Sequence, residues 1–204
     1  MDEKTDSAAQ GPPVETPTAV MPQVTVGEAI TKGWELIKAN PGVLILGVLV
    51  YFLVSWIPLI NFIFTGGLYM LALKAYRGQE TSVGEIFGHF DKFVALLVGG
   101  LLVFLAVLVG TALFVIPGIL LALVFSQVFF LITDKGMDGV EAMKESVRIT
   151  QGYRLTIFLF LLVMVVVSSL VALIPVVGAI IAMLLIFPII LGGQAYIYES
   201  IKDR

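Results

Sequence analysis

The chain has no cysteine and only one histidine among its 204 residues. Without cysteine it can form no disulfide, thiolate zinc site or cysteine-ligated iron–sulfur cluster, and it has no cysteine nucleophile. A metal site needs three or four ligands, usually including two or more histidines or cysteines, and His89 stands alone. The sequence therefore predicts no metal site, and no motif in it indicates a cofactor.

Charge is also scarce. Asp, Glu, Lys and Arg make up 13% of the residues and hydrophobic residues 59%, whereas about 25% of a soluble domain is charged. This composition is typical of an integral membrane protein. The formal net charge is −3 and no basic stripe is present, so we expect no nucleic-acid partner.

Three long runs carry no Asp, Glu, Lys, Arg or His, namely 39–73, 93–133 and 155–198. About 20 helical residues cross the roughly 30 Å hydrocarbon core of a bilayer, so each run approaches the length of two crossings. Proline removes a backbone donor and disfavours helix in the residue before it. Each run contains such a break near its middle, at Ile57-Pro58, Ile116-Pro117 and Ile174-Pro175.

Each run is therefore predicted to be a hairpin of two membrane helices, which gives six spans. We expect spans at about 42–57, 62–76, 155–173 and 176–198, with two more inside 93–133. Pro188 should kink the last span.

Short amphipathic segments precede the hairpins. A capping box pairs an N-cap Ser, Thr or Asp with a Glu three residues later, and it occurs at Thr25/Glu28, Ser82/Glu85 and Asp138/Glu141. These boxes open the segments 26–39, 82–92 and 138–151, which we expect to lie as helices along the membrane surface. Trp34 is the expected interfacial anchor of the first.

Two markers keep one period. Glu28, Glu85 and Glu141 lie 57 and 56 residues apart, and the isoleucines of the Ile-Pro pairs lie 59 and 58 apart. This predicts a threefold internal repeat. The expected fold is an all-α polytopic membrane protein with six transmembrane helices in three hairpins, each preceded by an interfacial helix. The expected parts are a disordered cytoplasmic tail over 1–24 and a membrane domain over 25–204, with repeats of about 25–80, 82–136 and 138–204.

The 12 Lys and Arg residues lie in the N-terminal segment, in 74–92, in 134–154 and at the C-terminus. In a six-span chain these segments share one face, and the Ile-Pro turns on the other face hold none. The positive-inside rule then places both termini in the cytoplasm.

Polar residues inside the spans are few. No ionisable residue lies at mid-depth, which argues against a proton relay or an ion-coupled pump. The candidate positions are Ser126, Gln127 and Gln194, which either line a substrate path or only hydrogen-bond between helices; we favour the second interpretation. Small residues four apart, such as Ala95/Gly99, indicate either packing within the bundle or a seam between copies.

Catalytic patterns are missing. The three capping glutamates could be imagined as a catalytic trio, but their capping role explains their positions. No nucleophile elbow, phosphate loop or zinc-protease helix is present. We therefore expect no catalytic residues and a protein that is not an enzyme.

One resemblance rests on three stretches of sequence: Ile116-Pro117-Gly118-Ile119-Leu120-Leu121-Ala122, then Asp134-Lys135-Gly136, then Glu141-Ala142-Met143-Lys144-Glu145-Ser146 followed by Thr150-Gln151-Gly152-Tyr153. This pattern resembles bacterial six-span membrane proteins of the YciC-like family and the membrane domain fused to some glycerophosphodiester phosphodiesterases. The resemblance covers about 26–204 and implies a multi-pass protein of the bacterial inner (plasma) membrane. It implies no catalytic residues.

Two functions stay open. The first is a non-enzymatic membrane protein that binds, scaffolds or helps to assemble membrane components. The second is a small permease or lipid-handling transporter with a site between the hairpins. The expected partners are membrane lipids and either another membrane protein or a second copy of the chain.

Overall fold

The computed structural model describes residues 23–203, and this part of the chain is all-α, without a β-strand. The predicted disordered tail lies outside the described residues except for its last two. One of these, Val24, is buried in the hydrophobic core.

The helices range in length from the 3 residues of η2 to the 21 residues of α4. Short 3-10 helices occur at η1 (Val83–Phe87) and η2 (Phe90–Lys92), and a π-helical segment at η3 (Ala182–Ile186). The α-helices are α1 (Val26–Ala39), α2 (Pro41–Val54), α3 (Asn61–Tyr76), α4 (Phe93–Leu113), α5 (Val115–Val124), α6 (Val128–Lys135), α7 (Gly139–Ile149), α8 (Arg154–Ala172), α9 (Val177–Ile181) and α10 (Phe187–Ile201).

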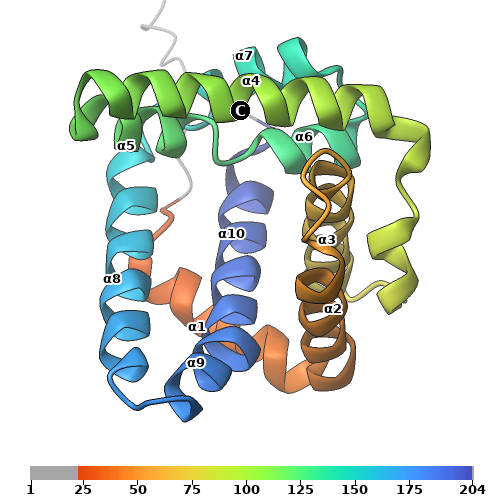
Figure 1. The fold of residues 1–204 in the computed structure, drawn as a ribbon, viewed down its shortest axis with the longest axis vertical. Coiled ribbons are helices and arrows are strands. Elements are labelled where there is room, and N and C mark those ends of the chain that lie inside the picture. The colour runs from red at the N-terminus through yellow and green to blue at the C-terminus, as the bar shows by residue number, and fades with distance from the viewer. Residues whose placement is uncertain (1–22, 204) are drawn as a thin grey trace, which may run out of the picture.

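Neighbouring helices along the chain pack against each other. α2 packs on α3, α4 on α5 and α6, and α8 on α9 and η3. Figure 1 shows α10 between α8 and the α2–α3 pair, with α4 running across one end of α8 and α10. The Ile-Pro pairs fall where the chain changes direction: Pro58 lies between α2 and α3, Pro117 in the first turn of α5 and Pro175 between α8 and α9.

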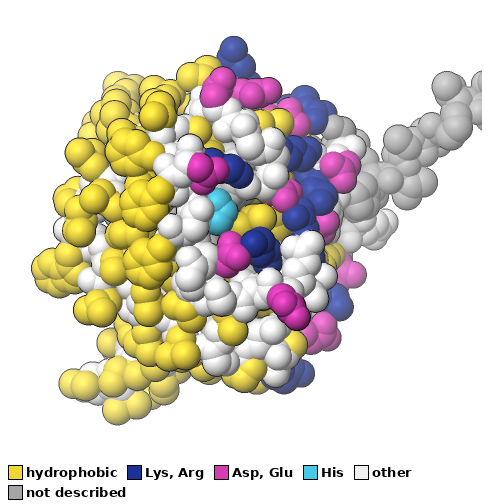
Figure 2. Space-filling model, turned by 90° about the vertical axis from the view of Figure 1, so that its right-hand side faces the viewer, with side chains coloured by type: hydrophobic (Ala, Val, Ile, Leu, Met, Phe, Trp, Pro, Cys, Tyr) yellow, Lys and Arg dark blue, Asp and Glu magenta, His cyan; other side chains and the backbone are white. Residues whose placement is uncertain are grey.

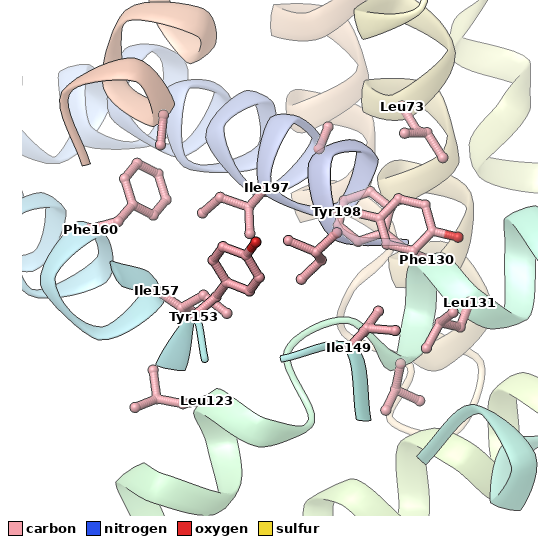
Figure 3. Packing of buried hydrophobic residues seen from close by; sticks show 14 of the residues in the cluster. Leu73, Leu123, Phe130, Leu131, Ile149, Tyr153, Ile157, Phe160, Ile197 and Tyr198 are labelled. Atoms are coloured by element: carbon pink, nitrogen blue, oxygen red, sulfur yellow. The ribbon is translucent and has the colours of Figure 1, made fainter. Parts of the chain in front are cut away.

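The helices α3, α6 and α10, here called the inner helices, form the centre of the molecule. α3 packs against both α6 and α10. The ring of Phe130 stacks on Tyr198 with centroids 4.9 Å apart, and Tyr69 lies 4.7 Å from Phe130. Figure 3 shows this core reaching from Leu73 on α3 to Ile157 and Phe160 on α8.

Two long helices, α4 and α8, here called the outer helices, expose most of their apolar side chains. α4 buries only Leu96, Gly99, Gly100 and Gly110, and α8 only Ile157, Phe160 and Met164. Large side chains such as Val94, Val109, Leu113, Leu155, Leu170 and Leu173 are more than half exposed. Figure 2 shows hydrophobic side chains gathered on one side of the molecule and charged ones on the other.

Four stretches of helix are long and apolar enough to cross a membrane, namely Val83–Leu113, Val115–Lys135, Arg154–Ala172 and Val177–Ile201. α1 and α2 together, bent by 100° at their junction, would make a fifth. α2 and α3 have only 14 and 16 residues, which is short for a 30 Å core because about 20 are needed. The chain thus has the helices of a multi-pass membrane protein.

α1 is held by glycine contacts with α10. A Cβ added at Gly33 would overlap the carbonyl oxygen of Ile189, and one at Gly192 would lie 2.8 Å from the Cα of Gly33. The buried residues of α1 are Ala29, Gly33, Leu36 and Ile37. Trp34, the expected interfacial anchor, is 42% exposed.

The prediction of a helix over 82–92 is wrong. The segment forms η1 and η2, because Gly84 and Gly88 disfavour a continuous α-helix. Ser82 makes no side-chain capping bond, and the Glu85 carboxylate instead pairs with Lys74 at 2.6 Å. The capping box predicted at Ser82/Glu85 is therefore absent.

The other caps are present. Thr25 and Glu28 form a complete capping box. Asp138 accepts hydrogen bonds from the backbone N–H groups of Val140 and Glu141 at 2.9 and 2.8 Å, so it caps α7. Within residues 23–203 the Glu141 side chain makes no return bond to the Asp138 N–H, and the box predicted there is only half formed.

Candidate functional site

α5 and α6 are separated by a helix break at residues 125–127. Sequence reasoning did not predict this break. An interrupted helix leaves carbonyl groups without intrahelical donors. Ser146 on α7 donates its hydroxyl to the carbonyl oxygen of Val124, the last residue of α5, at 2.6 Å. Thr150 in turn donates to the carbonyl oxygen of Ser146 at 2.7 Å. α7 thereby supplies a hydrogen-bond donor to the last carbonyl group of α5.

The three polar candidates from the sequence lie together at this break. Gln127 Nε2 donates to Gln194 Oε1 at 2.9 Å and to Ser126 Oγ at 3.0 Å. Gln127 lies just before α6 and Gln194 lies on α10. Both side chains are buried. We call Ser126, Gln127 and Gln194 the glutamine cluster.

One atom of the glutamine cluster has no partner. The Oε1 atom of Gln127 is buried and accepts no hydrogen bond from the described part of the chain. A buried acceptor left unpaired costs about 1–3 kcal/mol. The bond between Gln127 and Gln194 joins two helices, whereas the bond between Gln127 and Ser126 joins neighbouring residues of one segment.

A group of charged residues that sequence reasoning missed joins the ends of the inner helices. Arg77, after α3, makes a two-pronged contact with Asp134 at the end of α6, with Nη1–Oδ1 at 2.6 Å and Nη2–Oδ2 at 2.8 Å. Its Nε donates to Glu199 on α10 at 2.9 Å. Tyr198 donates its hydroxyl to Asp134 at 3.0 Å. We call Arg77, Asp134, Tyr198 and Glu199 the charged junction.

The charged junction is more than an exposed ion pair. The side chains of Arg77 and Asp134 are 19% and 13% exposed. The hydrogen bonds to the Asp134 carboxylate, and those to Glu199, raise the pKa of Arg77 above its ordinary value. Arg77 therefore stays charged at every physiological pH. Two-pronged contacts between guanidinium and carboxylate fix geometry as well as charge, so the junction sets how the inner helices meet.

A signal for the charged junction was present in the sequence. Each of its charged members comes at the end of a predicted second helix of a hairpin, just where an uncharged run stops. The sequence predicts charges there, but it does not show that the three helix ends converge.

The structure does not bring the capping glutamates together as a reactive group. The Glu28 carboxylate accepts hydrogen bonds from the backbone N–H and hydroxyl of Thr25 and from the Tyr196 hydroxyl, the last at 3.0 Å. Glu85 pairs with Lys74, and Glu141 lies on the exposed side of α7. Each of the three therefore has its own surroundings.

His89 lies apart from other metal-binding groups. Its Nδ1 atom is 3.1 Å from the carbonyl oxygen of Glu85. Among residues 23–203, no three His, Asp or Glu side chains are placed to hold a metal ion.

Comparison with known proteins found no match. No protein-family model, curated protein or solved structure matches the chain.

Proposed function

We propose that the chain is a non-enzymatic multi-pass membrane protein that binds and scaffolds other membrane components. The observation that carries this proposal is that the buried polar groups of the protein are bonded to other groups of the protein. Those of the glutamine cluster, of α7 and of the charged junction bond mainly to one another and to backbone. Such groups hold helices together, whereas a catalytic site needs polar groups that face a substrate.

The proposal includes six spans as three hairpins in a threefold repeat. It is supported by the three packed helix pairs, α2–α3, α4 with α5 and α6, and α8 with α9 to α10. The shortness of α2 and α3 would be accommodated by local thinning of the bilayer. The proposed location is a bacterial inner membrane, as the resemblance to the YciC-like family implies.

The proposed orientation places the charged side in the cytoplasm, with both termini there. The separation of charged from hydrophobic side chains supports it, because cytoplasmic loops carry the excess of Lys and Arg. The outer helices then face lipid or a partner.

The test is purification of the full chain in mild detergent, followed by mass spectrometry of the bound proteins and lipids. The proposal predicts one protein recovered in a fixed ratio with the chain. Recovery of the chain without any such protein, at several detergent concentrations, would contradict it.

A matched pair of variants locates the surface involved. Val165→Trp on α8 and Val109→Trp on α4 change side chains that are 59% and 56% exposed. Because both positions point outward, neither change should alter folding. Loss of the partner with only one of them identifies the outer helix that binds it.

The second candidate, a lipid-handling transporter, is favoured by one feature. The helices that contribute Gln127 and Gln194 are both irregular, at the α5–α6 break and at the π-helical η3, and interrupted helices form the sites of many transporters. Reconstituted into vesicles, such a protein would speed the exchange of a labelled phospholipid between leaflets. The double change Gln127→Leu and Gln194→Leu would abolish that exchange.

A further inference from the structure

A groove between α5 and α8 lies outside both sites described above. Its volume is about 390 Å³, which is within the range of small-molecule pockets, roughly 300–1,000 Å³. Figure 1 shows α5 meeting α8 at the end where α8 begins. Apart from Arg154, the side chains along the groove are apolar, including Ile119, Leu120, Leu155 and Phe158.

The floor of the groove belongs to the shared core. Leu123, at the bottom of the groove, is only 4% exposed and packs with the core that Figure 3 shows. The rim is open, since Leu120 and Leu155 are 52% and 68% exposed. A rigid apolar floor with an exposed apolar rim suits a flexible hydrocarbon chain that enters from the bilayer.

Arg154 gives the groove one positive end. Its Nε atom is buried and has no hydrogen-bond partner among the described residues. The one hydrogen bond that its side chain makes within residues 23–203 runs from Nη2 to the carbonyl oxygen of Val147 at 3.4 Å, which is long for such a bond. Leaving a buried charged donor unpaired is costly.

Arg154 differs from the other two arginines of the described chain. Arg77 pairs with Asp134 and Glu199, and Arg148 pairs with Glu145. No carboxylate between residues 23 and 203 lies within 4.0 Å of Arg154. Arg154 is also the first residue of α8, where the helix dipole favours an anion.

We infer that the groove between α5 and α8 binds an anionic phospholipid, with one acyl chain along α5 and the phosphate paired to Arg154. This rests on the proposed function in that it requires the chain to lie in a membrane. The phosphate supplies the acceptor oxygens that the guanidinium lacks, and two-pronged contacts with phosphate are a preferred geometry of arginine. The acyl chain covers apolar surface that the protein leaves open.

The test is native mass spectrometry of the full-length protein in detergent, titrated with phosphatidylglycerol, with phosphatidylcholine and with a free fatty acid of the same chain length. Phosphatidylglycerol should bind most tightly. Arg154→Gln should weaken its binding by about tenfold or more, because a charge-assisted contact is lost. Arg154→Lys keeps the charge but loses the two-pronged contact, so its binding should lie between those of the unchanged protein and Arg154→Gln. This order separates a lost charge from a misfolded protein.

A second variant tests the acyl chain separately. Leu120→Trp fills the groove and should weaken all three ligands, whereas Val109→Trp on α4, outside the groove, should weaken none. Unchanged phosphatidylglycerol binding in both Arg154→Gln and Leu120→Trp would overturn the inference. Equal binding of phosphatidylglycerol and phosphatidylcholine would also overturn it, since it would mean that the groove ignores the headgroup. If Arg154→Gln and Leu120→Trp still recover the protein partner, the proposed function stands even where the lipid site fails.

Discussion

The inner and outer helices are built from similar apolar sequences, yet they have different surroundings. α3 buries nine of its 16 residues, whereas α4 buries four of 21 and α8 three of 19. The inner helices carry Gly66, Gly67 and Gln194 in their middles and charges at their ends. The outer helix α4 also carries glycines, and three of its four buried residues are Gly99, Gly100 and Gly110. In this protein small residues therefore mark the protein-facing side of a helix, and buried polar and charged residues distinguish the inner helices from the outer ones.

The largest effect should come from truncating an inner aromatic residue. Phe130→Ala should lower the free energy of unfolding by about 3–5 kcal/mol, because Phe130 is fully buried against Tyr69 and Tyr198. Phe104→Ala on α4, where the side chain is 54% exposed, should change it far less. Thermal unfolding in detergent measures both, and equal losses would remove the distinction between inner and outer helices.

The charged junction should come next. Arg77→Ala leaves the Asp134 and Glu199 carboxylates without their partner, and breaking a largely buried pair costs about 3 kcal/mol. The matched control is Lys32→Ala, since the Lys32–Glu35 pair is about half exposed and solvent screening leaves such a pair little effect on stability. If the two variants unfold at the same temperature, the junction does not hold the inner helices together.

A smaller effect separates the two N-terminal caps. Thr25→Ala removes an observed capping box and should cost about 1 kcal/mol. Ser82→Ala should cost close to nothing, because the Ser82 side chain makes no cap. Denaturation in detergent compares the two. A larger loss of stability from Ser82→Ala than from Thr25→Ala would indicate that Ser82 caps a helix over 82–92.

The smallest effect should be at the glutamine cluster. Gln194→Leu removes the bond to Gln127, and such bonds between membrane helices contribute about 0.6 kcal/mol. Gln127→Leu should cost no more, because it also removes the unpaired Oε1 atom. A double-mutant cycle gives the coupling between the two residues, and a coupling of several kcal/mol would contradict their role as an ordinary interhelical contact.

Local rules predicted part of this structure. Proline predicted the helix breaks at Pro58 and Pro175, because a missing N–H acts on its own helix. Near Pro117 the break lies three residues earlier, at Phe114, and Pro117 itself is in the first turn of α5, where a proline needs no N–H partner. The capping pattern correctly predicted the N-caps Thr25 and Asp138, because a cap bonds to the first turn of its own helix. The three polar candidates also lie together as one cluster.

What sequence reasoning missed depends on contacts between distant segments. The pairing of Arg77 with Asp134 and Glu199 requires three helix ends to meet. The break after α5 is stable because Ser146, from another helix, bonds to Val124. The Glu85 carboxylate pairs with Lys74 and does not cap a helix with Ser82, because a hydrogen bond between two charged groups is stronger than one to a backbone N–H. Nothing in the local pattern of these residues shows which partner will be near.

The measurement that tests the central claim most directly is the labelling of single cysteines, made possible because the chain has none of its own. Trp56, Phe114 and Leu173 lie where helix pairs reverse and are 88%, 74% and 77% exposed. The exposed Glu80 lies in the loop between α3 and η1, which the proposed orientation places in the cytoplasm. Replaced one at a time by cysteine, the first three should react with a membrane-impermeant thiol reagent added to intact cells. Cysteine at 80 should react only after the membrane is opened. Labelling of position 80 in intact cells, or none at the three reversals, would contradict a multi-pass protein with its charged side in the cytoplasm.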